Sequence, residues 1–295
     1  MQFTFWGVRG SIAVPGPSTV RYGGNTTCIE VRGDNNELVI LDAGTGIFQL
    51  AQTLFAEFPI DINIFISHTH WDHIQGLPMF TPMFVPGNNI NLYGARDIVE
   101  NRSVKDVLSR QMEYSYFPLR ENELKSNMHY FDIQDQQDVQ IGSIKVSNFL
   151  LNHPVLNFGY RLECGGKTVV FTGDHEWPLN IYAEGDPEYS DYQAFLDLRR
   201  QQTLDFFRGA DALIIDTAYA DSEYPSRQGW GHGSFDASIR AARDAGVKKA
   251  FLTHHEPTRS DDQLEQVFEQ ALKRNGVCSS DPAFFLAQEG VQIEV

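Results

Sequence analysis

The first half of the chain is dominated by short apolar runs that are separated by Gly, Asn and Asp. Such runs, rich in β-branched and aromatic side chains, predict β-strands. The expected strands span residues 3–6, 27–32, 37–41 and 62–66, with a hairpin turn at residues 34–36. Residues 47–58 carry apolar side chains at helical spacing instead, so a helix is expected between the last two of these strands.

The remainder of the chain alternates between further apolar runs and segments with helical spacing. We expect strands at residues 90–93, 143–150, 158–163, 168–172, 212–216 and 249–253. Helices are expected at residues 95–114, 192–208, 235–245 and 262–273. Strands with interspersed helices in two similar halves predict an α/β protein in which two sheets pack face to face and helices cover them. No linker-like composition or short repeat interrupts the pattern, so a single domain spanning residues 1–295 is expected.

Composition and charge narrow the class of protein. Hydrophobic residues make up 42% of the chain, which is enough for a sizeable core and argues against disorder. The formal net charge of -16 argues against an extended nucleic-acid surface, which needs a basic face. A small anionic substrate remains compatible with this charge, because bound metal ions reverse the local field. Three scattered cysteines, no signal-peptide pattern and no apolar stretch near the ~20 residues that cross a bilayer predict a cytoplasmic protein without a membrane segment.

One heptapeptide, Ser67-His68-Thr69-His70-Trp71-Asp72-His73, concentrates metal-ligating side chains directly after the expected strand at residues 62–66. Histidines at alternate positions of an emerging strand point to the same face, and the chain then turns at Asp72 and His73. The chain has only 9 His in 295 residues, so such a cluster is improbable by chance. Imidazole and carboxylate groups at this spacing predict a site for a divalent metal.

Other candidate ligands share one placement, at or just beyond the end of an apolar run. They are His153, Asp174, Asp216 and His254. A single His or Asp in this place is often only a hydrogen-bonded residue or a turn cap. Because binding groups gather where strands end in α/β sheets, the repeated placement indicates that these side chains meet in one site.

The chain resembles the metallo-β-lactamase-fold hydrolases over nearly its full length. Besides the heptapeptide, the resemblance rests on Trp6-Gly7-Val8-Arg9-Gly10-Ser11, Leu41-Asp42-Ala43-Gly44-Thr45-Gly46, His153 before Phe158-Gly159-Tyr160, Phe171-Thr172-Gly173-Asp174, Gly231-His232-Gly233-Ser234 and Leu252-Thr253-His254. The chain looks most like the phosphodiesterase branch, which includes ribonuclease Z and the cyclic phosphodiesterases of phosphonate metabolism. The resemblance implies an αββα sandwich.

The resemblance also implies two divalent metal ions, zinc or else manganese, with a hydroxide between them as the nucleophile. The implied ligands are His68, His70 and His153 for one ion, Asp72, His73 and His254 for the second, and Asp174 bridging both.

Asp72 and His232 are the catalytic residues that the resemblance implies, in addition to the ligand role of Asp72. His232 belongs to the Gly-His-Ser segment of the branch, which supplies an acid or a charge stabiliser to the phosphate. The alternative for His232 is an exposed loop residue between two glycines. Asp216 could orient His232 or a ligand. Asp42 could likewise orient a ligating His, or it could cap its Gly-rich turn.

Three positions depart from the pattern of the branch. His175 follows Asp174 where a small hydroxyl residue is common, and Gly233 stands where Ser is usual, with Ser234 after it. His255 competes with His254 as a ligand, and His254 is favoured because it occupies the Leu-Thr-His position.

Several segments have roles that the sequence leaves open. Residues 176–192 and 80–84 could form a lid or a homodimer contact, or could be surface loop and core filling. Arg9, Arg21 and Tyr22 could help to hold a substrate, although surface solvation is the simpler interpretation for both arginines.

A small phosphodiester, such as a cyclic nucleotide or a cyclic phosphate sugar, is the favoured substrate. The acidic chain lacks the basic arm by which ribonuclease Z seizes tRNA. The alternatives are a ribonuclease, a thioester, lactone or β-lactam hydrolase on the same scaffold, and a metal-binding sensor without turnover. Asp174 argues against a β-lactamase, which typically lacks the bridging Asp. His232 argues against thioesterases and lactonases, which lack the Gly-His-Ser histidine.

Overall fold

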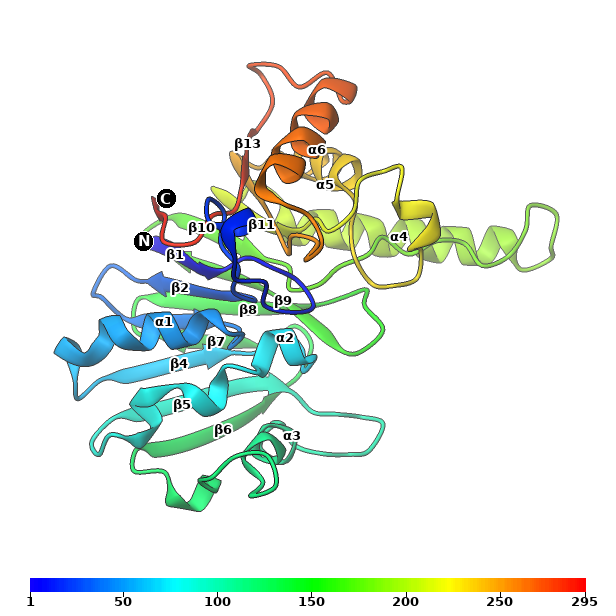
Figure 1. The fold of residues 1–295 in the computed structure, drawn as a ribbon. Helices are drawn as coiled ribbons and strands as arrows, with labels where there is room; N and C mark the ends of the chain where they lie inside the picture. The colour runs from blue at the N-terminus through cyan, green and yellow to red at the C-terminus, as the bar shows by residue number, and fades with distance from the viewer.

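The computed structural model describes residues 1–295 as two seven-stranded mixed sheets with helices outside (Figure 1). The first sheet has the strand order β14-β1-β2-β3-β4-β5-β6, and the second has the order β13-β12-β11-β10-β9-β8-β7. Helices α1 and α3 pack on the first sheet, and α4, α5 and α6 pack on the second. The predicted αββα sandwich is therefore confirmed.

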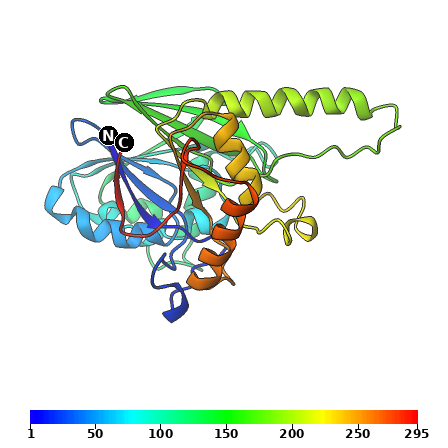
Figure 2. The same cartoon turned by 90° about the horizontal axis from the view of Figure 1, so that it is seen from above.

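The first sheet combines antiparallel and parallel pairs. Its strands are β1 (Gln2–Gly7), β2 (Cys28–Arg32), β3 (Leu38–Leu41), β4 (Asp61–Phe65), β5 (Asn89–Ala95), β6 (Asn127–Ile133) and β14 (Gln292–Glu294). Strands β3 to β6 run parallel, whereas β1 pairs antiparallel with both β2 and β14. The pairing of β1 with β14 places the two termini side by side (Figure 2).

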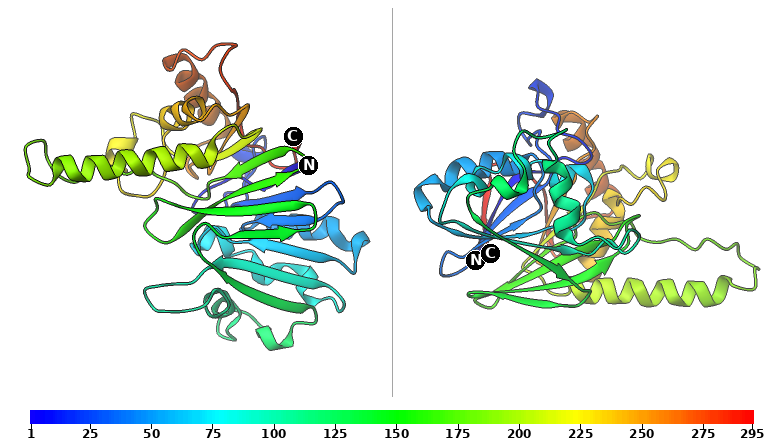
Figure 3. Two further views of the ribbon diagram at one scale, coloured as in Figure 1. Left: turned by 180° about the vertical axis from the view of Figure 1, so that it is seen from behind. Right: turned by 90° about the horizontal axis from the view of Figure 1, so that it is seen from below.

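The second sheet, which faces the viewer in the left panel of Figure 3, has the same mixed character. Its strands are β7 (Asp138–Ile141), β8 (Ile144–Leu151), β9 (Asn157–Cys164), β10 (Lys167–Phe171), β11 (Ala212–Asp216), β12 (Lys249–Thr253) and β13 (Ala283–Leu286). Strands β7 to β10 are antiparallel, and β10 to β13 are parallel. Neighbouring parallel strands place their carboxyl ends on the same edge of a sheet, which is where the candidate ligands follow.

The helices are α1 (Gly46–Thr53), α2 (Trp71–Ile74), α3 (Val104–Ser109), α4 (Tyr189–Phe207), α5 (Phe235–Asp244) and α6 (Asp261–Arg274). Capping side chains explain where several of them begin. Ser234 accepts a hydrogen bond from the Ala237 amide at the start of α5, and Ser260 forms a capping box at the start of α6. Ser234 of the Gly-His-Gly-Ser segment thus has a structural role that fixes the loop before it.

The space between the sheets is filled by alternate residues of the facing strands. Phe5 and Phe65 of the first sheet and Tyr160, Phe171 and Phe251 of the second belong to this one buried cluster. Two further clusters lie under the outer helices. The sheets are thereby held together through apolar burial along the length of the strands.

Some sequence predictions were wrong in detail. The helix expected at residues 95–114 shrinks to α3, because Ala95 still belongs to β5 and paired backbone hydrogen bonds between Asp97 and Arg102 close a loop. Strands β6, β7, β13 and β14 were not predicted. All four are edge strands, and β6, β7 and β14 lack a continuous apolar run. Within residues 80–84, Phe80 and Met83 are buried in the core, so this segment fills the core and is not a lid.

Helix α4 is an arm that extends beyond the sheets, with a loop at its outer end (Figures 1 and 2). The helix begins at Tyr189, three residues earlier than expected. The loop leading to it exposes Leu179 and Ile181, while Glu176 at the other end of the segment is buried. Among all the helices, none combines the length and the apolar composition that a membrane span requires.

Candidate metal centre

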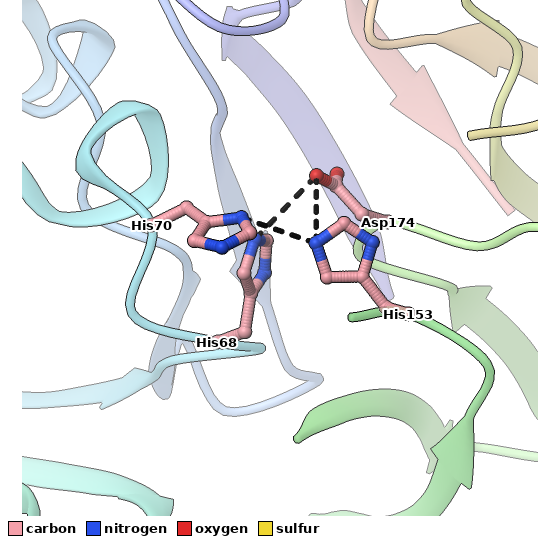
Figure 4. Close-up of side chains that lie close together, drawn as sticks. All are labelled: His68, His70, His153 and Asp174. Carbon is pink, nitrogen blue, oxygen red and sulfur yellow. Dashed lines mark hydrogen bonds and ion pairs between the residues drawn. The ribbon is translucent and has the colours of Figure 1, made fainter. Parts of the chain in front are cut away.

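The candidate ligands meet where β4, β8, β10, β11 and β12 end. His68, His70, Asp72 and His73 follow β4, His153 follows β8, Asp174 follows β10, Asp216 is the last residue of β11, and His254 follows β12. Because both sheets contribute strand ends to the same edge, segments far apart in the sequence surround one point. Figure 4 shows three of these imidazoles turned toward the carboxylate of Asp174.

The first group of donors consists of His68, His70, His153 and Asp174, whose ligand atoms all lie within 4.8 Å of one another. Nε2 of His68 is 3.5 Å from Oδ2 of Asp174, and Nε2 of His153 is 3.9 Å from the same oxygen. Nδ1 of His70 lies 3.1 Å from Nε2 of His153. Three imidazoles and a carboxylate oxygen are a donor set typical of zinc.

The second group consists of Asp72, His73, His254 and the same Asp174. Oδ1 of Asp174 lies 3.1 Å from Nε2 of His73 and 3.2 Å from Nε2 of His254. Oδ2 of Asp72 lies 3.4 Å and 3.2 Å from the same two nitrogens. One oxygen of Asp174 therefore faces each group, which is the geometry that a bridging carboxylate requires.

Buried atoms without partners indicate that these groups fit divalent cations. Nε2 of His68, Nε2 of His73 and Oδ1 of Asp174 are buried and make no hydrogen bond within the protein. Unpaired buried polar atoms are rare, and a bound ion is one of their ordinary explanations. Burial lowers the pKa of His68 and of His153, which favours the neutral imidazole that binds a metal.

The N-terminal loop closes against the second group. The Ser11 amide donates a 2.7 Å hydrogen bond to Oδ2 of Asp72. A Cβ atom on Gly10 would lie 2.1 Å from Cε1 of His254, so only glycine allows the backbone to pass this imidazole. These contacts explain why the segment from Trp6 to Ser11 carries the family pattern although it supplies no ligand candidate.

Asp42 orients a ligand candidate and does more than cap its turn. It is fully buried, and it accepts hydrogen bonds from the amide and the hydroxyl of Ser67 at 2.6 Å and 2.7 Å. Its Oδ2 also lies 2.7 Å from Nδ1 of His73. The carboxylate holds the proton of His73 on Nδ1 and leaves Nε2 free to face the site.

His232 lies beside the second group, and its exposed-loop alternative is wrong because its side chain is only 13% exposed. Its Nδ1 is 3.0 Å from Oδ2 of Asp216 and 3.7 Å from Oδ2 of Asp174. Burial alone would lower the pKa of His232, but the carboxylates of Asp216 and Asp174 outweigh it and raise that pKa. Asp216 also accepts the His175 amide, so one carboxylate connects the loop after β10 to His232.

Glu176 is a residue at this site whose role the sequence did not reveal. Its buried carboxylate accepts hydrogen bonds from the Tyr224 hydroxyl at 2.8 Å and from the amides of Gly229 and Gly231 at 2.8 Å and 2.7 Å. The Gly231 carbonyl in turn accepts Nδ1–H of His153 at 2.9 Å. Glu176 therefore fixes the loop that orients a ligand candidate and carries His232. Its sequence position, in a segment rich in acids, gave no signal of this.

His255 points away from the metal centre. It is fully buried, and its Nε2–H donates to the Ala287 carbonyl at 2.8 Å. The structure thus brings His254, and not His255, to the other ligand candidates. His175 is buried as well, with both ring nitrogens unpaired, and burial lowers its pKa to about 3.

Each of the three residues that could have held a substrate is paired with another part of the protein. Arg9 is fully buried, where it pairs with Asp261 at 3.2 Å, so the expectation of a surface position was wrong too. Arg21 pairs with Asp262 and Glu265 of α6, and the Tyr22 hydroxyl donates to Glu265 at 2.9 Å. All three join the N-terminal loop to α6 or to the chain before it.

The fold and the arrangement of donors define a metallo-β-lactamase-fold protein. Residues 38–255 match the family model described as "Beta-lactamase superfamily domain", and the chain belongs to this superfamily. It is 26% identical over 253 residues to ribonuclease Z of Thermoplasma volcanium, covering 75% of this chain and 79% of that protein.

Solved structures show the same fold. The metallo-β-lactamase fold protein YhfI from Bacillus subtilis superimposes with a TM-score of 0.68 at 20% identity, over 99% of each chain. A diphosphatase from the PhnP family superimposes with a TM-score of 0.65 at 19% identity, over 100% of this chain and 97% of the other. These two likenesses extend over nearly the whole of each chain, so the shared fold covers the full length of the protein.

Proposed function

We propose that this protein is a dinuclear metal-dependent phosphodiesterase that hydrolyses a small phosphodiester. The observation that carries the proposal is the position of Asp174, whose two oxygens face two donor groups while His232 lies 3.7 Å from one of them. His68, His70 and His153 would hold one ion, Asp72, His73 and His254 the other, and Asp174 both. Imidazole-rich donor sets favour Zn²⁺, and the carboxylates of the second site also admit Mn²⁺.

Two bound ions would supply a hydroxide nucleophile at neutral pH and would polarise the phosphoryl oxygens. The protein's own residues would orient the ligands and protonate the leaving oxygen. Asp42 and the Gly231 carbonyl keep the imidazoles of His73 and His153 in the tautomer that presents Nε2. His232, held by Asp216 through Nδ1, makes no hydrogen bond through Nε2. It would donate a proton from Nε2 to the leaving oxygen.

A ribonuclease is the second candidate, because the relative from Thermoplasma volcanium bears the name ribonuclease Z. The net charge of -16 argues against it, since binding along an RNA backbone needs many basic contacts. In a thioesterase or lactonase, the His232–Asp216 pair would have no evident catalytic role. A metal-binding sensor would have no need of a proton donor beside the metals.

The test is an assay of protein purified with its native metals, whose amounts are measured first. Bis(4-nitrophenyl) phosphate, a thioester, a lactone and a precursor tRNA are offered in parallel, with added Zn²⁺ or Mn²⁺. We expect two metal ions per chain and cleavage of the phosphodiester. Cleavage of the thioester or lactone alone, or of the tRNA with no activity on the small diester, would overturn the proposal.

A further inference from the structure

A cleft of about 850 Å³ adjoins the metal centre and shares His68 and His153 with it. Its walls come from three segments: residues 95–102 after β5, residues 152–156 after β8, and the arm formed by α4 with residues 177–178. All three extend on the same side of the sheets (Figure 1). A molecule in the cleft would therefore contact the first group of donors from the side of the arm.

The outer walls of the cleft are apolar although they are open to solvent. Ile98, Val99, Val155 and Phe195 all line it, and their exposed fractions are 71%, 89%, 40% and 52%. The lining residues of α4 recur at helical spacing from Tyr192 to Thr203, so one face of the helix lines the cleft. Exposed apolar side chains that converge on a cleft are typical of a ligand-binding site.

Two polar side chains of the lining have hydrogen-bonding groups that the protein leaves without a partner. His175 is buried, and neither of its ring nitrogens has a hydrogen-bond partner. Arg199 bonds only the Leu150 carbonyl and Gln202, whereas the other three arginines of the cleft each pair with a carboxylate. A polar group of a ligand would find a partner in Arg199, whereas the ring nitrogens of His175 are covered by the protein and lie out of its reach.

Most of the remaining polar side chains of the lining are bonded within the protein, which leaves only the hydroxyls of Thr69 and Tyr192 to read a nucleobase. The Asn152 amide donates to the Glu176 carbonyl, and the Thr203 hydroxyl donates to the Arg199 carbonyl. Asp97 is bound to Arg102. Recognition of a base edge needs several free donors and acceptors, so an apolar group suits this lining better.

We propose that the cleft binds the alkyl arm of a phosphodiester whose phosphoryl group lies at the metal centre and whose other ester oxygen leaves beside His232. The substrate class is thus a diester with one hydrophobic arm. The inference rests on the proposed function, and it assigns the arm α4 and the segment before it a role in substrate selection.

The first test compares methyl 4-nitrophenyl phosphate with butyl 4-nitrophenyl phosphate and with thymidine 5′-(4-nitrophenyl phosphate). Burial of three further methylene groups should raise kcat/KM for the butyl ester at least about tenfold over the methyl ester. Equal values for the two alkyl esters, or a preference for the thymidine ester over the butyl ester, would overturn the cleft assignment and leave the phosphodiesterase proposal standing. No cleavage of any ester would contradict the phosphodiesterase proposal itself.

Variants locate the effect in the cleft. Phe195→Ser and Val155→Ser change exposed side chains of the lining and should lower the butyl-to-methyl ratio several-fold. Leu198→Ser is the matched control, because Leu198 lies on the same helix, is 57% exposed and does not line the cleft. An equal change of the ratio in the control would refute the assignment, as would an unchanged ratio in both lining variants.

A binding measurement decides the question without turnover. Dodecyl phosphate should bind the metal-loaded protein, as seen by displacement of the fluorescent probe 1-anilinonaphthalene-8-sulfonate. Phe195→Ser should weaken this binding about tenfold, and Leu198→Ser should not. Sedimentation is measured under the same conditions. If Phe195→Ser converts a dimer to monomers and leaves dodecyl phosphate binding unchanged, a second copy of the chain covers this face and the proposal is wrong.

Discussion

Oδ2 of Asp42 lies 2.7 Å from Nδ1 of His73, and both side chains are buried. The Asp42 backbone has a positive φ of 62°, which turns its side chain back under the loop that carries the heptapeptide. The same carboxylate accepts the amide and the hydroxyl of Ser67. The turn after β3 and the loop after β4 are thus joined through one buried charge.

Replacing Asp42 should therefore weaken metal binding. Asp42→Asn keeps the shape and tolerates the positive φ, but it removes the charge that stabilises the Nδ1–H tautomer of His73. We expect about a 10–100-fold loss in affinity for one of the two ions. Titration against a chelating dye measures it, and circular dichroism verifies the fold. Unchanged affinity for both ions would show that Asp42 serves the turn alone.

Removal of the metals should destabilise the protein and abolish its activity. Without cations, Asp72, Asp174 and Asp216 are buried acids grouped around a few imidazoles. Each site that is saturated a hundredfold above its dissociation constant contributes about 2.7 kcal/mol to the free energy of unfolding. Calorimetry with and without a chelator should show a Tm lower by several degrees, restored by Zn²⁺. An equal Tm and equal activity after chelation would contradict the metal assignment.

His232→Ala should leave two ions bound and reduce phosphodiester turnover by about 10²–10⁴-fold, the usual contribution of a positioned acid. The matched control is His129→Ala, which removes an exposed histidine of β6 outside the centre. Metal content and kcat are measured for both variants. Loss of an ion in His232→Ala would mean that His232 is itself a ligand, which its 3.7 Å distance to Asp174 makes worth testing.

Glu176→Gln should lower kcat more than it raises KM, because the amide cannot accept three hydrogen bonds as the carboxylate does. The loop of Gly231 and His232 would lose its anchor, while the substrate contacts remain. Tyr224→Phe removes only one of the three donors and should have a milder effect. Full activity in Glu176→Gln, or a change confined to Tm in both variants, would show that Glu176 serves stability alone.

The neighbours His254 and His255 should respond in opposite ways to alanine substitution. His254→Ala should lose one ion, because its Nε2 faces Asp72 and Asp174. His255→Ala should keep both ions and lower the free energy of unfolding by about 2 kcal/mol, since it leaves the Ala287 carbonyl without its donor and opens a small cavity. Metal analysis and denaturant unfolding of the pair distinguish the two roles. Loss of an ion from His255→Ala would exchange the assignments.

Most of the sandwich could be predicted because its central strands are continuous apolar runs. Residues 38–41 and 212–215 are examples, whose uniformly apolar composition predicts burial on both faces of the strand. Edge strands such as β6 and β14 escaped prediction, since one face or one edge is solvated and the apolar signal weakens. The helix expected at residues 95–114 failed for a related reason: hydrogen bonds between Asp97 and Arg102, local to the loop, outweighed helical spacing.

The sequence by itself determined the types and the order of the candidate ligands, because chemistry at a metal site depends on donor identity and because the ligands follow strand ends that composition reveals. Only the tertiary structure decided which residues position these ligands and what surrounds them. Four features depend on contacts between distant segments. They are the anchoring of the loop by Glu176, the burial of Arg9, the orientation of His255 away from the metal centre, and the cleft along α4. Such contacts have no local sequence signature. The sequence around a carboxylate or an arginine does not reveal whether that side chain is solvated or bonded to a buried partner.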